Sequence, residues 1–343
     1  MEGLVVEMCW ALVLVGVCSV LMRVLELVWL KPRRLRSTLG RQGISGPQPT
    51  FLYGNLPEMH KIQSTIARPP NDDHRVSHHR WSDFIFPYLQ QWTHQYGQVY
   101  MYSTGNKQHL YVSRPELMKE FNLHKSLDLG KPLYLASAME PMLGDGIIKA
   151  NGRHWALQRK LIAPEFFLDK VKERVRAEIV ELCGDRHHYR SPDMDTLHKL
   201  KTLTMVIQET LRLYGPGVIM AREVFADMKF GDLFVPKGMH IWSLIPSLHR
   251  DPENWGPDVN EFKPERFARG ISEACKYPQA YIPFGYGTRL CVGQTFAMVE
   301  LKMMLSRILS NFSFSLSPNY RHSPIYRMLL VPEYGIRLLI KEV

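Results

Sequence analysis

The stretch FGYGTRLCVG at residues 284–293 combines one cysteine with three glycines and an arginine, and it runs directly into a helical pattern. Gly285, Gly287 and Gly293 allow a ligand to approach the main chain closely, and they allow positive φ. Cys291 precedes the helix, where N–H groups and the helix dipole favour a thiolate. The stretch therefore predicts a site where a flat or bulky ligand lies against the main chain beside sulfur.

Three roles are open for Cys291 on these grounds: a metal ligand, a nucleophile, or a small buried hydrophobic residue. Arg289 supplies a cation suited to a carboxylate two residues away, and Phe284 supplies an apolar wall. A nucleophilic cysteine usually needs a base, and no histidine lies in this loop. A thiolate that ligates iron in an aromatic pocket needs no base, so this role is favoured.

The same stretch resembles the haem-binding signature F-x-x-G-x-R-x-C-x-G of cytochrome P-450 monooxygenases. All five fixed positions match, at Phe284, Gly287, Arg289, Cys291 and Gly293. The resemblance implies that Cys291 is the axial ligand of haem b (iron protoporphyrin IX) and that Arg289 pairs with a haem propionate. It also implies a mainly α fold with small β-sheets.

Two shorter motifs of that family follow the family order. Trp155-x-x-x-Arg159 is similar to its propionate-binding W-x-x-x-R, whereas Trp29-x-x-x-Arg33 fits the pattern only by accident, inside an apolar segment. Together with the signature, this order predicts that Trp155 and Arg159 bind the haem.

The second motif is E-x-x-R at Glu209 and Arg212, which share one helix face at i, i+3. In the family this pair joins the arginine of a later loop, here Arg266 in Pro-Glu-Arg-Phe. The implied role is structural, as a mutually satisfied buried network. A second match at residues 173–176 lacks this context.

One part of the family pattern is absent. The family's oxygen-activating helix carries A/G-G-x-x-T, and it should lie between the two motifs, but this sequence has no Ala-Gly or Gly-Gly dipeptide. No threonine can be assigned the oxygen-activating role, so the catalytic residue is unknown. The sequence up to Lys172 resembles the family's helix after W-x-x-x-R, whereas the sequence from Glu173 resembles a helix shortly before E-x-x-R. We therefore predict an internal deletion near 172/173. It would remove the oxygen-activating helix and neighbouring helices through a splice isoform or a gene-model error.

The N-terminus predicts a membrane anchor at residues 1–30. Residues 8–22 carry no charge, and the basic sequence KPRRLR follows at residues 31–36. The apolar stretch extends from Leu4 to Leu30 and is interrupted only by Glu7, Arg23 and Glu26. This longer stretch suffices to span a bilayer if these ionisable residues snorkel, and the basic residues that follow it favour a cytosolic body. The alternative is a buried amphipathic helix of a soluble protein. A basic, Pro/Gly-rich connector at residues 31–60 leads to an incomplete haem-thiolate domain at 61–343. The sequence of the connector resembles that of plant members of the family that oxidise gibberellins and other terpenoids.

Composition agrees with this organisation. Lys and Arg number 43 against 33 Asp and Glu, giving a net charge of +10, and the five cysteines show no CxxC pair. A disulfide scaffold is therefore excluded, a structural zinc site is not favoured, and no motif indicates nucleic acid. The positive charge suits an anionic leaflet and an acidic protein partner.

The sequence thus predicts a monooxygenase of the endoplasmic reticulum membrane that inserts one oxygen atom from O2 into a small lipophilic substrate. An NADPH-dependent reductase would supply electrons. Two alternatives remain: a non-catalytic remnant that binds haem without activating oxygen, and a cytosolic thiol enzyme.

Local patterns predict the surrounding elements. Helices are expected at 84–96, 115–124, 152–161, 173–183, 197–214 and 294–309, and a strand, turn and strand at 99–112. The His-rich residues 61–80 are expected to form a solvated loop rather than a metal site, because they lack ligand spacing.

Overall fold

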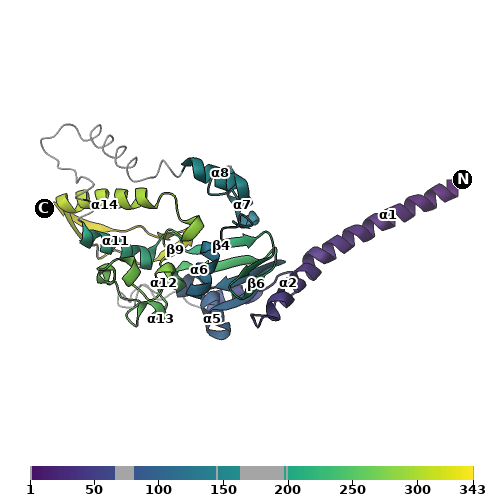
Figure 1. Cartoon of the computed structure of the whole chain (residues 1–343), viewed down its shortest axis with the longest axis horizontal. Helices are drawn as coiled ribbons and strands as arrows, with labels where there is room; N and C mark the ends of the chain where they lie inside the picture. The colour runs from purple at the N-terminus through teal and green to yellow at the C-terminus, as the bar shows by residue number, and fades with distance from the viewer. Residues whose placement is uncertain (1, 66–80, 144–145, 163–196, 198–199, 343) are drawn as a thin grey trace.

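The structure is a computed structural model that describes residues 2–65, 81–143, 146–162, 197 and 200–342. Its fold is mainly helical with small β-sheets, as the sequence predicts. A long helix projects from one side of the body, and the C-terminus lies at the opposite side (Figure 1). The predicted helix at 173–183 and most of the His-rich segment fall outside the described residues.

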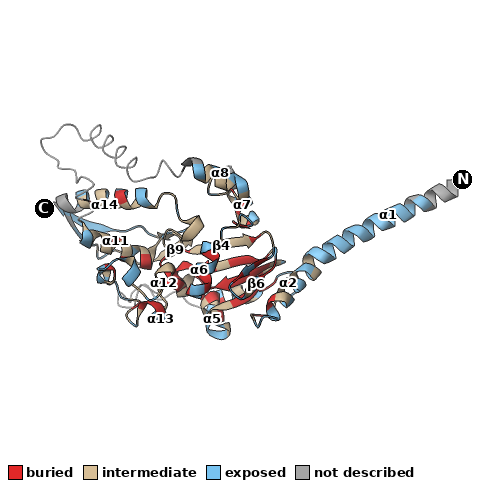
Figure 2. Cartoon of the chain, in the orientation of Figure 1, coloured by how far each residue is buried: buried red, intermediate tan, exposed pale blue. Residues whose placement is uncertain are grey.

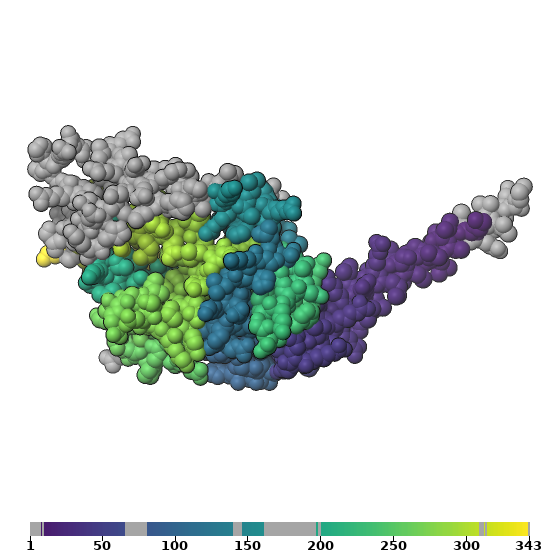
Figure 3. Space-filling view, viewed as in Figure 1, coloured from purple at the N-terminus to yellow at the C-terminus, as the bar shows by residue number. Residues whose placement is uncertain are grey.

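The N-terminal helical rod consists of α1 (Glu2–Leu25), a π-helical turn η1 (Glu26–Leu30) and α2 (Lys31–Gly40). Among the described residues, one helix, Trp10–Gly40, is long and apolar enough to cross a membrane, and its most apolar window is unburied. The described part of α1 stands clear of the body in the space-filling view (Figure 3) and is exposed (Figure 2). The basic segment is therefore helical, and it joins the body through the buried Leu35 and Leu39.

A five-stranded sheet forms the centre of the body, with strand order β1-β2-β7-β4-β3. Its strands are β1 (Val99–Thr104), β2 (Lys107–Val112), β3 (Leu129–Gly130), β4 (Ile219–Val224) and β7 (His240–Leu244). β1 and β2 form the predicted hairpin, β7 runs parallel to β2, and β4 runs antiparallel to β7. Strands from both halves of the chain therefore build one sheet.

Three two-stranded sheets surround the central one. They pair β5 (Met228–Phe230) with β6 (Leu233–Val235), β8 (Phe312–Leu316) with β11 (Leu338–Glu342), and β9 (Pro324–Arg327) with β10 (Leu329–Pro332). The main body helices are α3 (Leu56–Thr65), α4 (Trp81–Ile85), α5 (Pro87–Tyr96), α6 (Pro115–Leu123), α7 (Leu133–Leu143), α8 (Gly152–Ile162), α11 (Lys201–Tyr214), α12 (Ile245–His249), α13 (Pro252–Trp255) and α14 (Gln294–Asn311). Short 3-10 turns include η4 (Pro264–Phe267) and η7 (Gly287–Arg289).

Most predicted helices are present, with one division. The helix expected at 84–96 is split into α4 and α5, because Pro87 begins a new helix and Phe86 leaves the helical region at φ −128°. The helix expected at 197–214 begins at Lys201 in the structure.

Two buried clusters hold the body together. The larger joins the central sheet to α2, α6 and the β5–β6 hairpin, and it includes Ile282, which lies just before the cysteine loop. The second is aromatic and packs Trp92 against Tyr100 and Tyr102. The cysteine loop therefore starts from the main core rather than from a free surface segment.

Candidate functional site

The cysteine loop is held in shape by its backbone. The N–H of Cys291 donates to the carbonyl of Phe284 at 2.7 Å, which closes the loop, and α14 begins three residues later. The Cys291 thiol is free and exposed. The loop thus presents one sulfur atom at the surface just ahead of a helix N-terminus.

The loop glycines have different functions. Gly285 and Gly287 have positive φ, at 78° and 64°. A Cβ on Gly287 would lie 2.2 Å from the carbonyl oxygen of Asn122, so a side chain there would collide with α6. Gly293 caps α14 with φ −88°, so it does not use the positive φ that glycine allows.

Trp155 and Arg159 lie against this loop although they are more than 120 residues away in sequence. Arg159 Nη1 donates to the carbonyl of Leu290 at 2.5 Å. The guanidinium of Arg289 stacks over the Trp155 ring, 3.6 Å from its centroid. One face of α8 therefore brings both predicted residues to the residues that flank Cys291.

Arg289 has an unused donor. Its Nη2 donates to the carbonyl of Leu129 at 2.9 Å, whereas its buried Nη1 has no hydrogen-bond partner in the described part of the chain. Burial, and then the charge of Arg159, lower the pKa of Arg289 to about 10. An anion beside Nη1 would satisfy the donor and stabilise the charge.

Sequence reasoning missed two further cations at this site. Burial lowers the pKa of Arg222 on β4 to about 10, with a further contribution from Arg289. Burial lowers the pKa of Lys131 to about 8, followed by the charges of Arg289 and Arg222. Their local sequence offers little signal, because Lys131 is a lone lysine in a loop and Arg222 precedes Glu223, which suggests a surface pair.

The donor set fits a haem better than a metal ion alone. Among the described residues, no group of three or more His, Cys, Asp or Glu side chains could hold a metal. Cys291 offers a single sulfur ligand, and the cations Lys131, Arg159, Arg222 and Arg289 gather nearby with an unsatisfied donor. A porphyrin would supply the remaining iron ligands itself, and its two propionates would supply the missing negative charge.

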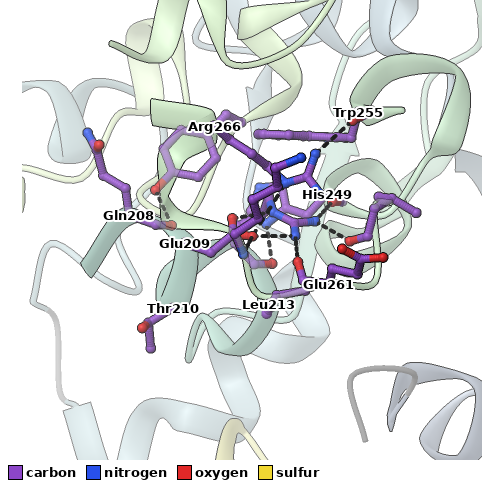
Figure 4. Close-up of polar contacts among 12 residues, drawn as sticks. Gln208, Glu209, Thr210, Leu213, His249, Trp255, Glu261 and Arg266 are labelled. Atoms are coloured by element: carbon purple, nitrogen blue, oxygen red, sulfur yellow. Dashed lines mark hydrogen bonds and ion pairs between the residues drawn. The ribbon is translucent and has the colours of Figure 1, made fainter. Parts of the chain in front are cut away.

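A buried ionic network joins α11 to η4 (Figure 4). Arg212 on α11 donates to both carboxylate oxygens of Glu209, at 2.6 and 2.8 Å, and both side chains are fully buried. Arg266 of η4 approaches Glu209 at 3.5 Å and pairs with Asp258 at 2.7 Å. The structure thus brings Glu209, Arg212 and Arg266 together and adds Asp258, which the motifs do not contain.

His249 connects this network to the cysteine loop. Arg212 Nη1 donates to the carbonyl of His249 at 2.8 Å, and the Ile282 N–H donates to His249 Nε2 at 3.0 Å. Because Nε2 accepts, the ring is neutral and donates from Nδ1 to the carbonyl of Arg212 at 3.1 Å. Burial lowers the pKa of His249 to about 3, which keeps the ring neutral.

Comparison with known proteins gives a consistent result. The family model described as Cytochrome P-450 matches residues 76–173 and 168–340. Cytochrome P-450 714A2 of Arabidopsis thaliana is 33% identical over 523 positions that cover 98% of this chain and 99% of the relative. Cytochrome P-450 714C2 of rice (Oryza sativa subsp. japonica) is 32% identical, covering 92% and 94%, and cytochrome P-450 714B3 of maize (Zea mays) is 28% identical, covering 99% and 97%. The Arabidopsis alignment is 180 positions longer than the 343 residues of the chain.

Proposed function

Because the chain belongs to the cytochrome P-450 family, whose members are monooxygenases that bind haem b, we propose that Cys291 is the axial ligand of a haem b iron. The observation that carries this proposal is the convergence of Trp155 and Arg159 on the residues that flank Cys291. Bound haem supplies oxygen activation, which an electron-rich thiolate ligand promotes.

The residues of the chain would have separate tasks in this site. Cys291 holds the iron, while Arg289, with its free Nη1, and Arg159 hold and orient the propionates. Trp155 positions the guanidinium of Arg289, and Phe284 lines the sulfur side. Glu209, Arg212 and Arg266 keep the loop in place through His249 without touching the cofactor.

Family membership supports a proposal for the substrate class and the electron donor. Family members use reductase partners and lipophilic substrates. We propose an NADPH-dependent reductase as the partner of this chain and a small lipophilic compound, a terpenoid or plant hormone, as its substrate. The plant sources of the relatives support this choice.

We further propose that α1 anchors the chain in the endoplasmic reticulum membrane, with the body in the cytosol. The exposed apolar surface of the helix and the exposed basic residues Lys31, Arg33 and Arg34 after it support this orientation. The connector and incomplete domain then occupy residues 31–60 and 61–343.

A second function, haem binding without oxygen activation, is favoured by two observations. The sequence lacks the Ala-Gly or Gly-Gly dipeptide of the oxygen-activating motif, and the alignment with the Arabidopsis relative has 180 more positions than the chain has residues. The two matches of the family model meet at residues 168–173, which supports an internal deletion near 172/173. Sequencing the transcript across Lys172 and Glu173 tests this. A transcript that joins the two codons directly supports a splice isoform, whereas an intervening coding segment shows that the translated protein is longer and that the deletion is a gene-model error.

One spectrum followed by one assay tests both functions. The full chain, purified with added haem, is reduced and exposed to carbon monoxide, and a red-shifted Soret band reports thiolate ligation. Cys291→Ser should abolish the band, whereas Cys275→Ser should keep it. The Cys275 thiol donates to the Tyr277 carbonyl at 3.4 Å, and Cys275 packs against the Trp255 cluster rather than lying in the cysteine loop. A band that survives in Cys291→Ser refutes the ligand assignment.

The assay then adds reductase, NADPH and a panel of terpenoids. Product formation supports the monooxygenase, and a band without product supports the non-catalytic function. Absence of the band in the unmodified chain refutes thiolate-ligated haem, on which both proposed functions rest.

A further inference from the structure

A cavity of about 220 Å³ lies between two loops of the C-terminal strands. The loop from β8 to β9 contributes Asn319 and Arg321 to its lining. The loop from β10 to β11 contributes Tyr334, Gly335 and Arg337. The lining of this cavity, which we call the arginine cavity, thus holds two guanidinium groups, an amide and a phenol, and no carboxylate from the described residues.

Hydrogen bonds hold the two loops to each other on both sides of the arginine cavity. The Ser317 N–H donates to the Arg337 carbonyl at 3.0 Å, directly beyond the last paired residues of β8 and β11. Farther along, the Glu333 N–H donates to the Ser323 carbonyl at 2.8 Å, and the Ser323 hydroxyl donates to the Glu333 carboxylate at 2.6 Å. The spacing of the loops is therefore set before a ligand binds, which lowers the cost of binding.

The two guanidinium groups have no negative partner. Arg321 stacks on the Tyr334 ring of the opposite loop, 4.6 Å from its centroid, which positions the guanidinium without neutralising it. Within the described part of the chain, neither Arg321 nor Arg337 forms an ion pair with a carboxylate. Two positive charges thus line one cavity without a counter-charge, and a bound anion would stabilise both.

We propose that the arginine cavity binds the phosphate group of a soluble phosphate monoester. Each guanidinium presents a planar fork of N–H groups that pairs with two phosphate oxygens. A phosphate monoester carries a charge of about −1.5 to −2 at pH 7 and has three acceptor oxygens. Two arginines on separate loops match this charge better than that of a carboxylate, and the Asn319 amide offers a further donor.

The place of the arginine cavity in the fold favours a soluble ligand over a lipid headgroup. The cavity precedes β11, which ends at the C-terminus, and the C-terminus lies on the opposite side of the body from α1 (Figure 1). If α1 spans the membrane as proposed, the headgroups lie on the other side of the body. None of the lining residues belongs to the cations around Cys291, so the proposal does not depend on haem.

Titration calorimetry of the full chain in phospholipid-free detergent, with phenyl phosphate as the probe, tests the proposal. Arg337→Gln should weaken binding about tenfold or more, because hydrogen bonds to charged groups are the strong ones. Arg321→Gln should do the same, although it also removes the contact with Tyr334, so Arg337→Gln is the decisive variant. Arg327→Gln is the matched control, at an exposed arginine of β9 outside the lining, and it should bind as the unmodified chain does.

Two further probes test the chemical class of the ligand. Benzenesulfonate, which is similar in shape but carries a single negative charge, should bind more weakly than phenyl phosphate. No binding of phenyl phosphate to the unmodified chain, equal affinity in Arg337→Gln and Arg327→Gln, or equal affinity for the two probes would each overturn the proposal. Binding of phosphate only when phosphatidic acid vesicles present it would assign the cavity to a lipid and overturn the soluble ligand.

Discussion

Arg289 carries a charge next to a buried donor that an anion would satisfy. Its guanidinium is lodged between the Trp155 ring and the Leu129 carbonyl, and its Nη1 has no partner in the described residues. A charge-assisted hydrogen bond contributes about 1.5–3 kcal/mol, so Arg289→Gln should weaken haem binding about ten- to hundredfold. Titration of the apoprotein with hemin measures this. Arg153→Gln, at an exposed arginine of α8, should bind as the unmodified chain does, and an equal loss in both variants would contradict the assignment.

Arg212 contributes to stability rather than to chemistry. It is fully buried with Glu209 and also donates to the carbonyls of His249 and Val259. Removal of one partner from a buried ion pair costs about 3–5 kcal/mol, so Arg212→Met should lower the free energy of unfolding by that amount. Arg269→Met removes an i, i+4 pair with Glu273 whose side chains are 79% and 54% exposed, and it should cost about 0–1 kcal/mol. Urea denaturation of both variants measures the difference, and equal losses would refute the buried network.

At the scale of elements, the parallel pairing of β2 with β7 creates a pH-sensitive contact. The register places His109 opposite His240, and the buried Nδ1 of each ring has no hydrogen-bond partner among the described residues. Burial, followed by the charges of Lys107 and Lys31, lowers the pKa of His240 to about 4, and burial lowers that of His109 well below its ordinary value.

The direction of the pH effect follows from these shifts. Because each pKa is lower in the folded chain than in the unfolded one, the unfolded chain binds protons first, and stability falls as the pH drops below about 6.5. Protonation of His240 in the unfolded chain should lower the free energy of unfolding by about 3 kcal/mol by pH 4. His240→Gln should remove this contribution to the pH dependence of stability. Urea titrations between pH 7 and pH 4 measure it. His94→Gln, at an exposed histidine of α5, should leave the pH dependence unchanged, and a similar change there would show that the effect does not come from the sheet.

Local sequence patterns predicted individual helices and strands better than they predicted which of these elements contact one another. The strand-like residues on either side of the Gly105-Asn106 turn are sufficient to predict the β1–β2 hairpin. The helical spacing of apolar residues at 201–214 is sufficient to predict α11. The motifs singled out Trp155, Arg159 and Arg289 because they carry chemistry at fixed spacing. Arg222 and Lys131 reach the site only because β4 lies between β7 and β3 in the sheet, and no local pattern encodes that order. The same holds for Asp258, which joins Arg266 through the folding of a loop.

At the scale of the whole molecule, the C-terminal hairpin leaves an apolar face open. Phe314 and Leu316 of β8 lie opposite Ile340 and Leu338 of β11, and these four side chains are 39–65% exposed on one face. Met304 of α14, a helix that leads directly into β8, is also 57% exposed. An exposed apolar face of this kind promotes association. It is expected if the proposed deletion removed helices that cover this side in longer relatives.

This face predicts self-association that one charge should weaken. Leu316→Lys places a cation in the apolar face, whereas Ser315→Lys adds the same charge to the same strand on the opposite face. Because burial of one leucine contributes about 1.5–3 kcal/mol, Leu316→Lys should weaken association about tenfold or more, and Ser315→Lys should leave it nearly unchanged. Energy transfer between donor- and acceptor-labelled chains in vesicles, at increasing chain-to-lipid ratio, measures the effect. Equal transfer in the two variants would assign the association to the membrane helices, since neither substitution touches α1.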